Sequence, residues 1–287
     1  MPEPNNTPKP KLGHLYHAEA TVLEGDLELP LIQEIKPQAY IKLPELGGYF
    51  SQRVENYRLG EVISFRSAHT QVAGNLNPKK DHGYATLATS VIEGLNVLDV
   101  VTADRIIGQV ITEQPFDGYV PHISFLGTRF ENLRIAGKPV DVTLNLDILG
   151  ARSKSDALYT QSADLKKDID KQFADLGEHK SWLDQMREGY HKLFPATASG
   201  ELNRETLECS LVSEVGGGYP GHVIRIPGFG TIVLARVSLT HQEIKQGEDV
   251  LRPTTVCLTM IDFKLGCPMV ANFTAGTTIN NGWPEPG

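Results

Sequence analysis

Cysteine is scarce in this chain, and its placement excludes two small-domain architectures. Cys209, Cys257 and Cys267 are the only cysteines among 287 residues, and no two of them form a CxxC pair. An odd number without such a pair is not the pattern of a disulfide framework or a zinc knuckle. The pattern favours buried free thiols. A single disulfide between Cys209 and Cys257 is the alternative.

Long apolar runs and positive charge are also missing. No stretch of eighteen or more apolar residues occurs, so we predict no membrane-spanning helix. The net charge is −8, and the largest lysine cluster, Lys79-Lys80, lies beside Asp81. Nucleic acid and anionic membranes both require a cationic patch, so neither is expected as a partner. Met1–Asn6 has no basic or apolar start, which predicts a cytoplasmic protein as written and a cell-surface one if a leader is missing.

Sequence motifs of common catalytic sites are absent as well. The chain contains no G-x-S-x-G elbow and no calcium loop of the D-x-[DN]-x-[DN]-G type. The glycine-rich stretch Gly216–Gly221 leads into an apparent strand, whereas a phosphate-binding loop leads into a helix. We therefore predict no cofactor and no metal.

What the chain does contain is turn residues and alternation. It has 27 glycines and 18 prolines, which suits many strands joined by turns. Apolar and polar residues alternate within 15–31, 61–72, 84–93 and 100–113, and again repeatedly after residue 206. Alternation with period two is typical of half-buried strands. The pattern predicts a mainly β protein, a two-layer antiparallel sandwich with a hairpin turn at Glu24-Gly25-Asp26.

Two phrases of the sequence occur twice. Ala20–Gly25 is echoed by Ala88–Gly94, and Tyr40–Gly48 is echoed by Val223–Gly230. Each phrase resembles a strand that a glycine turn closes, so we predict an internal pseudo-repeat. The predicted organisation is an extended tail (1–12), one β-rich domain of two related parts (13–76 and 83–276) and a C-terminal tail (277–287).

The period changes from two to about 3.6 in one segment, residues 162–194. Its apolar residues recur in steps of three, four and seven, which predicts an amphipathic helical hairpin inserted into the sandwich. Gly177 divides the hairpin and Pro195 ends it. Leu183, Met186 and Tyr190 on its apolar stripe are the candidate interface residues.

Histidines are the natural candidates for acid–base chemistry. His82, His122 and His222 lie singly near predicted turns, and only the fold can bring them together. They are the candidate catalytic residues if the protein is an enzyme.

Several phrases carry a resemblance to a known family. Ala88–Leu98, Val101–Asp104, Phe130–Pro139 and Ile226–Ile232 resemble the domain of bacterial choice-of-anchor surface proteins, type P, over residues 84–149 and 222–276. The resemblance implies a β-rich, surface-associated protein and supplies no catalytic residue. The helical insert departs from the family pattern.

These observations favour a non-enzymatic binding or self-assembly module that forms a homo-oligomer or takes a protein or glycan ligand. Edge strands of a sandwich can pair between copies. One alternative is a hydrolase-like enzyme with histidine and carboxylate chemistry in a pocket between sheet and insert. The other is a carbohydrate-binding module with a row of exposed aromatic residues.

Overall fold

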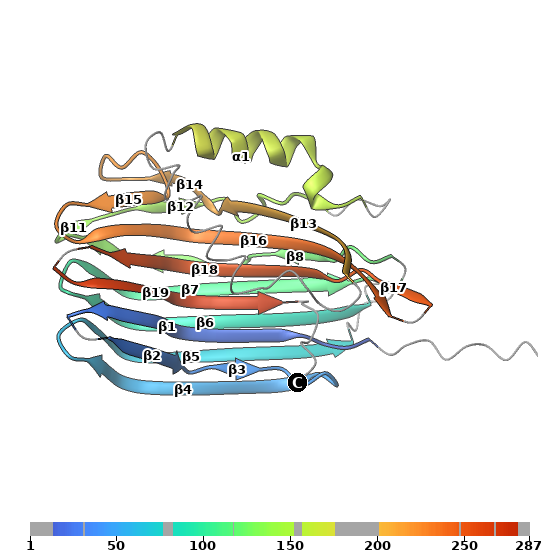
Figure 1. Cartoon of the computed structure of the whole chain (residues 1–287), viewed down its shortest axis with the longest axis horizontal. Helices are drawn as coiled ribbons and strands as arrows, with labels where there is room; N and C mark the ends of the chain where they lie inside the picture. The colour runs from blue at the N-terminus through green and yellow to red at the C-terminus, as the bar shows by residue number, and fades with distance from the viewer. Residues whose placement is uncertain are drawn as a thin grey trace, which may run out of the picture.

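The computed structural model describes residues 14–30, 32–76, 83–116, 118–151, 157–175, 201–246, 248–266 and 268–280. Its strands form two large antiparallel sheets that pack face to face, and one short helix lies beside them (Figure 1). The predicted fold class, a mainly β two-layer sandwich with a helical insert, is confirmed. Within the described part of the chain, no helix is long and apolar enough to cross a membrane.

The first sheet has nine strands in the order β13-β16-β18-β19-β1-β2, with β15 and β17 paired to β16 and β3 paired to β1. Strands from both predicted parts of the chain therefore share this sheet. Their bounds are β1 (Ala18–Leu29), β2 (Gln33–Gln38), β3 (Ile41–Lys42), β13 (Glu201–Ser210), β15 (Val223–Ile226), β16 (Gly230–Gln246), β17 (Asp249–Leu251), β18 (Thr254–Leu265) and β19 (Val270–Asn280).

The second sheet has eight strands in the order β11-β10-β7-β6-β5-β4, with β8 and β9 also paired to β7. A separate two-stranded sheet pairs β12 with β14. The bounds are β4 (Gly48–Leu59), β5 (Ile63–Leu76), β6 (Tyr84–Val97), β7 (Val101–Gln114), β8 (His122–Ser124), β9 (Arg129–Glu131), β10 (Arg134–Ile135), β11 (Lys138–Pro139), β12 (Val142–Leu144) and β14 (Val212–Val215).

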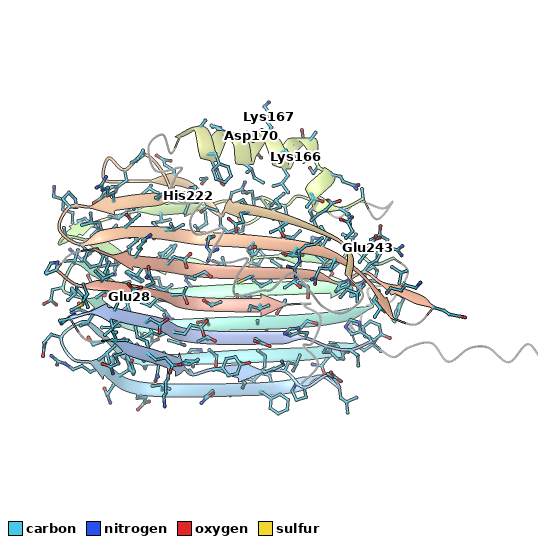
Figure 2. The ribbon with its side chains drawn as sticks, viewed as in Figure 1. Glu28, Lys166, Lys167, Asp170, His222 and Glu243 are labelled. Carbon is cyan, nitrogen blue, oxygen red and sulfur yellow. The ribbon has the colours of Figure 1, made fainter. Side chains whose placement is uncertain are left out.

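The helical insert begins with a 3-10 turn, η1 (Tyr159–Gln161), and continues as α1 (Ala163–Asp175). Leu165 and Ile169 on α1 are buried, while Lys167 points away from the sheets (Figure 2). The Gln172 amide pairs with the backbone of Ser210: its Nε2 donates to the Ser210 carbonyl at 2.8 Å, and its Oε1 accepts from the Ser210 N–H at 3.0 Å. The Gln172 amide thus makes the two hydrogen bonds that a neighbouring strand would make to Ser210. The edge of β13 is therefore closed by α1 at this residue.

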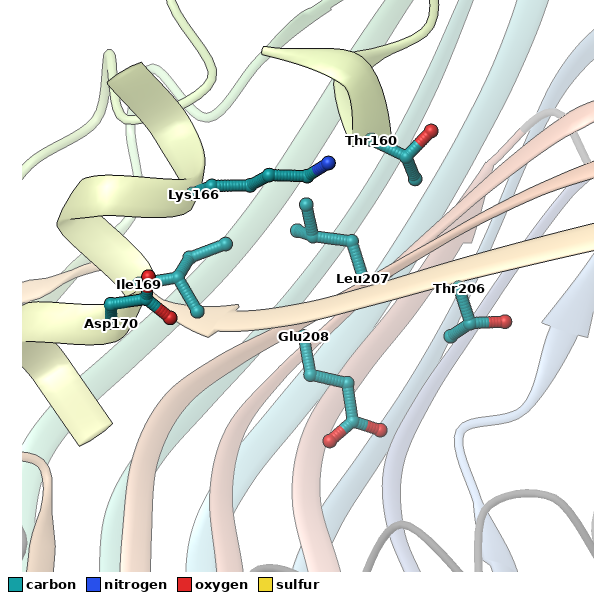
Figure 3. Close-up of a pocket in the computed structure, with 7 residues that line it drawn as sticks. All are labelled: Thr160, Lys166, Ile169, Asp170, Thr206, Leu207 and Glu208. Atoms are coloured by element: carbon teal, nitrogen blue, oxygen red, sulfur yellow. The ribbon is translucent and has the colours of Figure 1, made fainter. Parts of the chain in front are cut away.

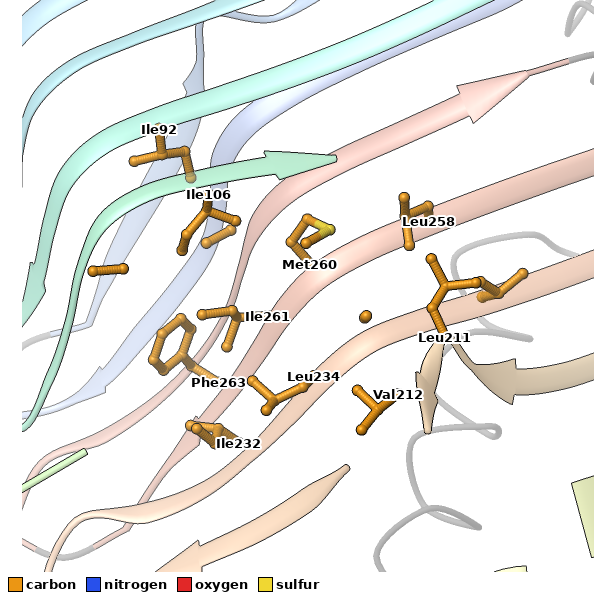
Figure 4. Packing of buried hydrophobic residues seen from close by; sticks show 14 of the residues in the cluster. Ile92, Ile106, Leu211, Val212, Ile232, Leu234, Leu258, Met260, Ile261 and Phe263 are labelled. Carbon is orange, nitrogen blue, oxygen red and sulfur yellow. The ribbon is translucent and has the colours of Figure 1, made fainter. Parts of the chain in front are cut away.

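The core lies between the two sheets, and every long strand changes its inward-facing set at the same position. On β18, Val256, Leu258 and Met260 are buried in the core, but the next core residues are Ile261 and Phe263. On β6 the core set likewise passes from Ile92 to Leu95. Figure 4 shows side chains from both sheets gathered where the ribbons curve.

We call this position the bend line. The residue pairs on either side keep one register, but the ladder is interrupted where the bend line crosses each strand. In each sheet, alternate strands cross it with a positive φ, at Ala235 and Gly276 in one and at Asn56 and Gly94 in the other. No extra residue is inserted, so the register is kept, and because the positive-φ residues lie side by side the strands bend together. The residues on the line are Val22, Ala235, Met260 and Gly276 in the first sheet and Asn56, Arg66, Gly94 and Asp104 in the second.

Buried polar links join the two sheets. The Asn280 side chain is fully buried, and its Nδ2 donates to the carbonyls of Thr86 (3.1 Å) and Val110 (2.9 Å) on the opposite sheet. Nearby, the Ser90 hydroxyl donates to the carbonyl of Thr21. Such direct backbone contacts require the sheets to approach closely.

Two predicted boundaries were wrong. The expected hairpin at Glu24-Gly25-Asp26 does not exist, because β1 continues through it and pairs with β19 on both sides of Gly25. The predicted C-terminal tail starts too early, because β19 extends to Asn280. Residues 281–287, the tail 1–12 and the second half of the helical hairpin lie outside the described residues.

The remaining organisational predictions have mixed outcomes. Cys209 and Cys257 are buried free thiols, as favoured, and burial raises the pKa of Cys209 to about 12 and that of Cys257 to about 11. The repeated phrases Ala20–Gly25 and Ala88–Gly94 lie on β1 and β6, which belong to opposite sheets. The pseudo-repeat itself stays a prediction.

Gly25 gives a direct test of the close strand packing. It has φ +146°, and a Cβ at this position would lie 2.3 Å from the carbonyl oxygen of Asn272. We expect Gly25→Ala to lower the free energy of unfolding by about 3 kcal/mol, through backbone strain and overpacking. Gly137→Ala is the control: φ is also positive (+75°), but nothing lies within 4 Å, so the cost should be only about 1 kcal/mol. Equal losses in urea titrations of the two variants would contradict this account.

Candidate functional site

The residues that the sequence nominated do not form one site in the described structure. His122 is half-buried on β8 of the eight-stranded sheet, whereas His222 is buried beside β15 of the nine-stranded sheet (Figure 2). His82 lies outside the described residues, as do Leu183, Met186 and Tyr190, so their roles stay predictions. Across the described ranges, no group of three or more His, Cys, Asp or Glu side chains could hold a metal ion.

One edge of the eight-stranded sheet is open. β4 has 12 residues, and among the described strands it pairs only with β5. Most of its side chains are exposed, including Tyr49 and the 42% exposed Phe50. Of the aromatic residues nearby, Phe65 is buried and Tyr57 stacks on it at 4.9 Å between ring centroids. The aromatic residues of this region therefore divide between core and surface.

Phe50 and Val54 belong to the core-facing row of that edge strand. Their partners on β5 are Val72 and Ala68, which are fully buried. Between them, Gln52 pairs with Thr70, whose hydroxyl donates at 2.6 Å to the carbonyl of Ala39, in the bend between β2 and β3 of the facing sheet. The facing sheet thus covers β5 at this row, while Gln52 and Phe50 on β4 remain exposed.

Two neighbouring cavities adjoin β13 and the insert. The larger, about 320 Å³, lies between the insert and β13 (Figure 3). Lys166, Ile169 and Asp170 of α1 face the strand there, while Leu207 and Glu208 point to opposite sides of it.

Glu208 belongs to a buried charge cluster. Arg236 holds Asp262 by two hydrogen bonds, at 2.7 Å (Nε) and 3.3 Å (Nη2), and its Nη1 lies 4.0 Å from Glu208 Oε1. Burial alone would lower the pKa of Arg236, but the two carboxylates raise it above its usual range. A cation held between two carboxylates in this way is a structural element, because removing either partner leaves a buried charge uncompensated.

The smaller cavity, about 200 Å³, lies at the end of the sandwich, where β13 and β16 meet η1 and the segment before β8. Glu205 of β13 and His241 of β16 are directly paired and both line it. The Thr160 hydroxyl of η1 donates to Glu205, and Tyr159 stacks on the His241 ring at 6.2 Å. The insert therefore forms one wall of this cavity and positions its carboxylate.

His241 is the most unusual side chain of this cavity. It is only 5% exposed, and its Nδ1 lies 2.8 Å from the Thr254 hydroxyl. Its Nε2 is buried and has no hydrogen-bond partner among the described residues. Burial lowers the pKa of His241 to about 4, although Glu205 acts in the opposite direction. The imidazole is therefore neutral at pH 7.

The sequence analysis selected neither His241 nor Glu205. The two are distant in the chain, and only the antiparallel pairing of β13 with β16 makes them neighbours. In the sequence, both residues merely lie in segments where apolar and polar residues alternate. That pattern does not show which residues of two strands become neighbours until the strand register is known.

The buried histidines should make stability depend on pH. Burial also lowers the pKa of His222 to about 4, from an ordinary value of 6.5. Between about pH 4 and about pH 6.5 the imidazole is protonated in the unfolded chain but not in the folded chain. The free energy of unfolding therefore rises as pH rises from about 4 to about 6.5. Each buried imidazole can contribute up to about 3 kcal/mol to this rise.

We expect His222→Gln to reduce that rise and His222→Gln/His241→Gln to flatten it further. Urea titrations between about pH 4 and pH 7 measure the effect. A double variant with the wild-type pH slope would show that these imidazoles do not carry the dependence.

Comparison with known proteins adds a family and nothing further. No curated protein and no solved structure matches the chain. The resemblance to choice-of-anchor surface proteins finds no support there and stays a prediction. One family model matches residues 14–240, and its description is a domain of unknown function, DUF8256. Since this match spans most of the chain, the protein belongs to the DUF8256 family.

Proposed function

We propose that this protein is a non-enzymatic β module that self-associates through the open edge of β4. The observation that carries the proposal is Phe50, a 42% exposed aromatic residue in the core-facing row of an edge strand. An unpaired strand edge offers free backbone N–H and C=O groups to another strand. Burying the exposed apolar residues of the same strand would also favour such pairing.

The occupant that best fits this edge is β4 of a second copy. Antiparallel pairing centred on Gln52 sets Phe50 opposite Val54 of the partner copy, and Val54 opposite its Phe50. The four side chains then extend the core-facing row across the new interface. Pairing centred on Arg53 would instead place two like charges opposite each other.

The shape of β4 limits how far the pairing extends. Asn56, with φ +54°, lies on the bend line, so the straight part of the strand is Gly48–Glu55. Pairing centred on Gln52 uses only that part. A contact of β4 with β4 is isologous and closes as a dimer.

On the first sheet, Gln172 occupies the backbone groups of Ser210, so this end of the β13 edge is not open to another strand. This supports a closed dimer over an open chain of copies.

The test is the mass of the protein in solution. We expect a concentration-dependent dimer for the wild type by sedimentation velocity, and at least a tenfold weaker dimer for Phe50→Lys, which places a charge in the new apolar row. Leu126→Lys is the control, since Leu126 is 59% exposed and lies away from β4. A wild type that stays monomeric at the highest concentrations, or a Phe50→Lys dimer of unchanged strength, would refute the proposal.

A further inference from the structure

The cavity at Glu205 and His241 is independent of the β4 edge and carries a separate inference. The edge lies on the eight-stranded sheet, whereas this cavity has β13 and β16 of the other sheet as its main wall. Its volume of about 200 Å³ is room for roughly six waters at about 30 Å³ each. A ligand of this size is a single small molecule rather than a chain segment.

The first argument is an unused polar group. His241 Nε2 is buried in the cavity wall without a partner among the described residues, while the other ring nitrogen is engaged by Thr254. Buried polar atoms are almost always hydrogen-bonded, by protein, water or ligand. Because less than 1 Å² of this atom is accessible, a bound molecule can satisfy it only when the cavity wall shifts slightly toward the ligand.

The second argument is the chemistry of the walls. The side-chain amides of Gln161 and Asn203 both donate and accept, and Glu205 accepts only. Groups that both donate and accept, as hydroxyls do, match such a mixture. A carboxylate or phosphate on a ligand would lie close to Glu205 and be repelled by it.

The third argument is the charge balance at the rim. Arg252, the cation among the lining residues, donates to Glu243 at 2.8 Å, and its guanidinium lies 5.2 Å from the ring centroid of Tyr119. Its charge is thereby matched, so the cavity retains the negative charge of Glu205. Tyr119 is also a wall residue and supplies an aromatic surface for aliphatic C–H groups.

We propose that this cavity binds a neutral, polyhydroxylated small molecule of the size of one sugar unit. In this arrangement its hydroxyls donate to Glu205 and exchange hydrogen bonds with the wall amides, and a small shift of the wall brings Nε2 of His241 within reach of one of them. Because Thr160 of η1 holds Glu205, binding requires the insert to be docked on the sheet.

The experiment titrates the full-length protein with free glucose, galactose and N-acetylglucosamine, and with glucuronate as the anionic counterpart. Ligand-observed NMR and isothermal titration calorimetry are the readouts. We expect at least one neutral sugar to bind at millimolar concentration or below, and glucuronate to bind at least tenfold more weakly than glucose.

Glu205→Gln keeps the shape of the side chain, removes its charge and should weaken sugar binding at least tenfold. Asn203→Ala at the wall should have the same effect if Glu205→Gln does not fold. The matched control is Asp170→Asn, which changes an equivalent group in the neighbouring cavity and should leave the affinity unchanged.

The proposal is overturned if no neutral sugar binds, if glucuronate binds as well as glucose, or if Asp170→Asn weakens binding as much as Glu205→Gln. Since Phe50→Lys changes only the β4 edge, a monomeric variant that still binds sugar separates this inference from the proposed self-association.

Discussion

The structure depends on the bend line, where all the long strands of a sheet change their inward-facing side chains together. A strand that bent alone would lose its register with its neighbours, and a one-residue slip would turn its apolar set toward solvent. Because Ala235 and Gly276, like Asn56 and Gly94, interrupt their ladders at matching positions, the sheets keep register and still bend. The bent sheets can then approach closely enough for Asn280 and Ser90 to bond the backbone of the opposite layer.

This constraint also explains how much of the fold could be predicted from sequence. The alternating runs predict strands correctly, since burial on one face has period two whatever the global fold. The same rule fails at the bend line, where Met260 and Ile261 are adjacent and both face the core. The predicted hairpin at Gly25 was wrong because Glu-Gly-Asp is typical of a turn. In the structure this glycine instead lets the backbone of β19 pass close to β1.

The candidate site was less predictable than the fold. His122 and His222 carry the same local signal as His241, and nothing in the sequence shows that the first two end on different sheets. The environment of His241 comes from three distant segments: Glu205 on β13, Thr254 on β18 and Tyr159 on the insert. Neighbours of that kind follow from strand order, and strand order in a sandwich is set by the whole chain rather than by any short motif.

The hydrogen bonds of Gln172 to Ser210 give the insert a second role besides forming a wall of the cavity: they keep another strand from pairing with the end of β13. Were α1 to detach, the backbone groups of Ser210 would become free to bind another strand, while β4 kept its own open edge. Two open edges on different sheets permit open-ended association, whereas the β4 contact that we propose closes as a dimer.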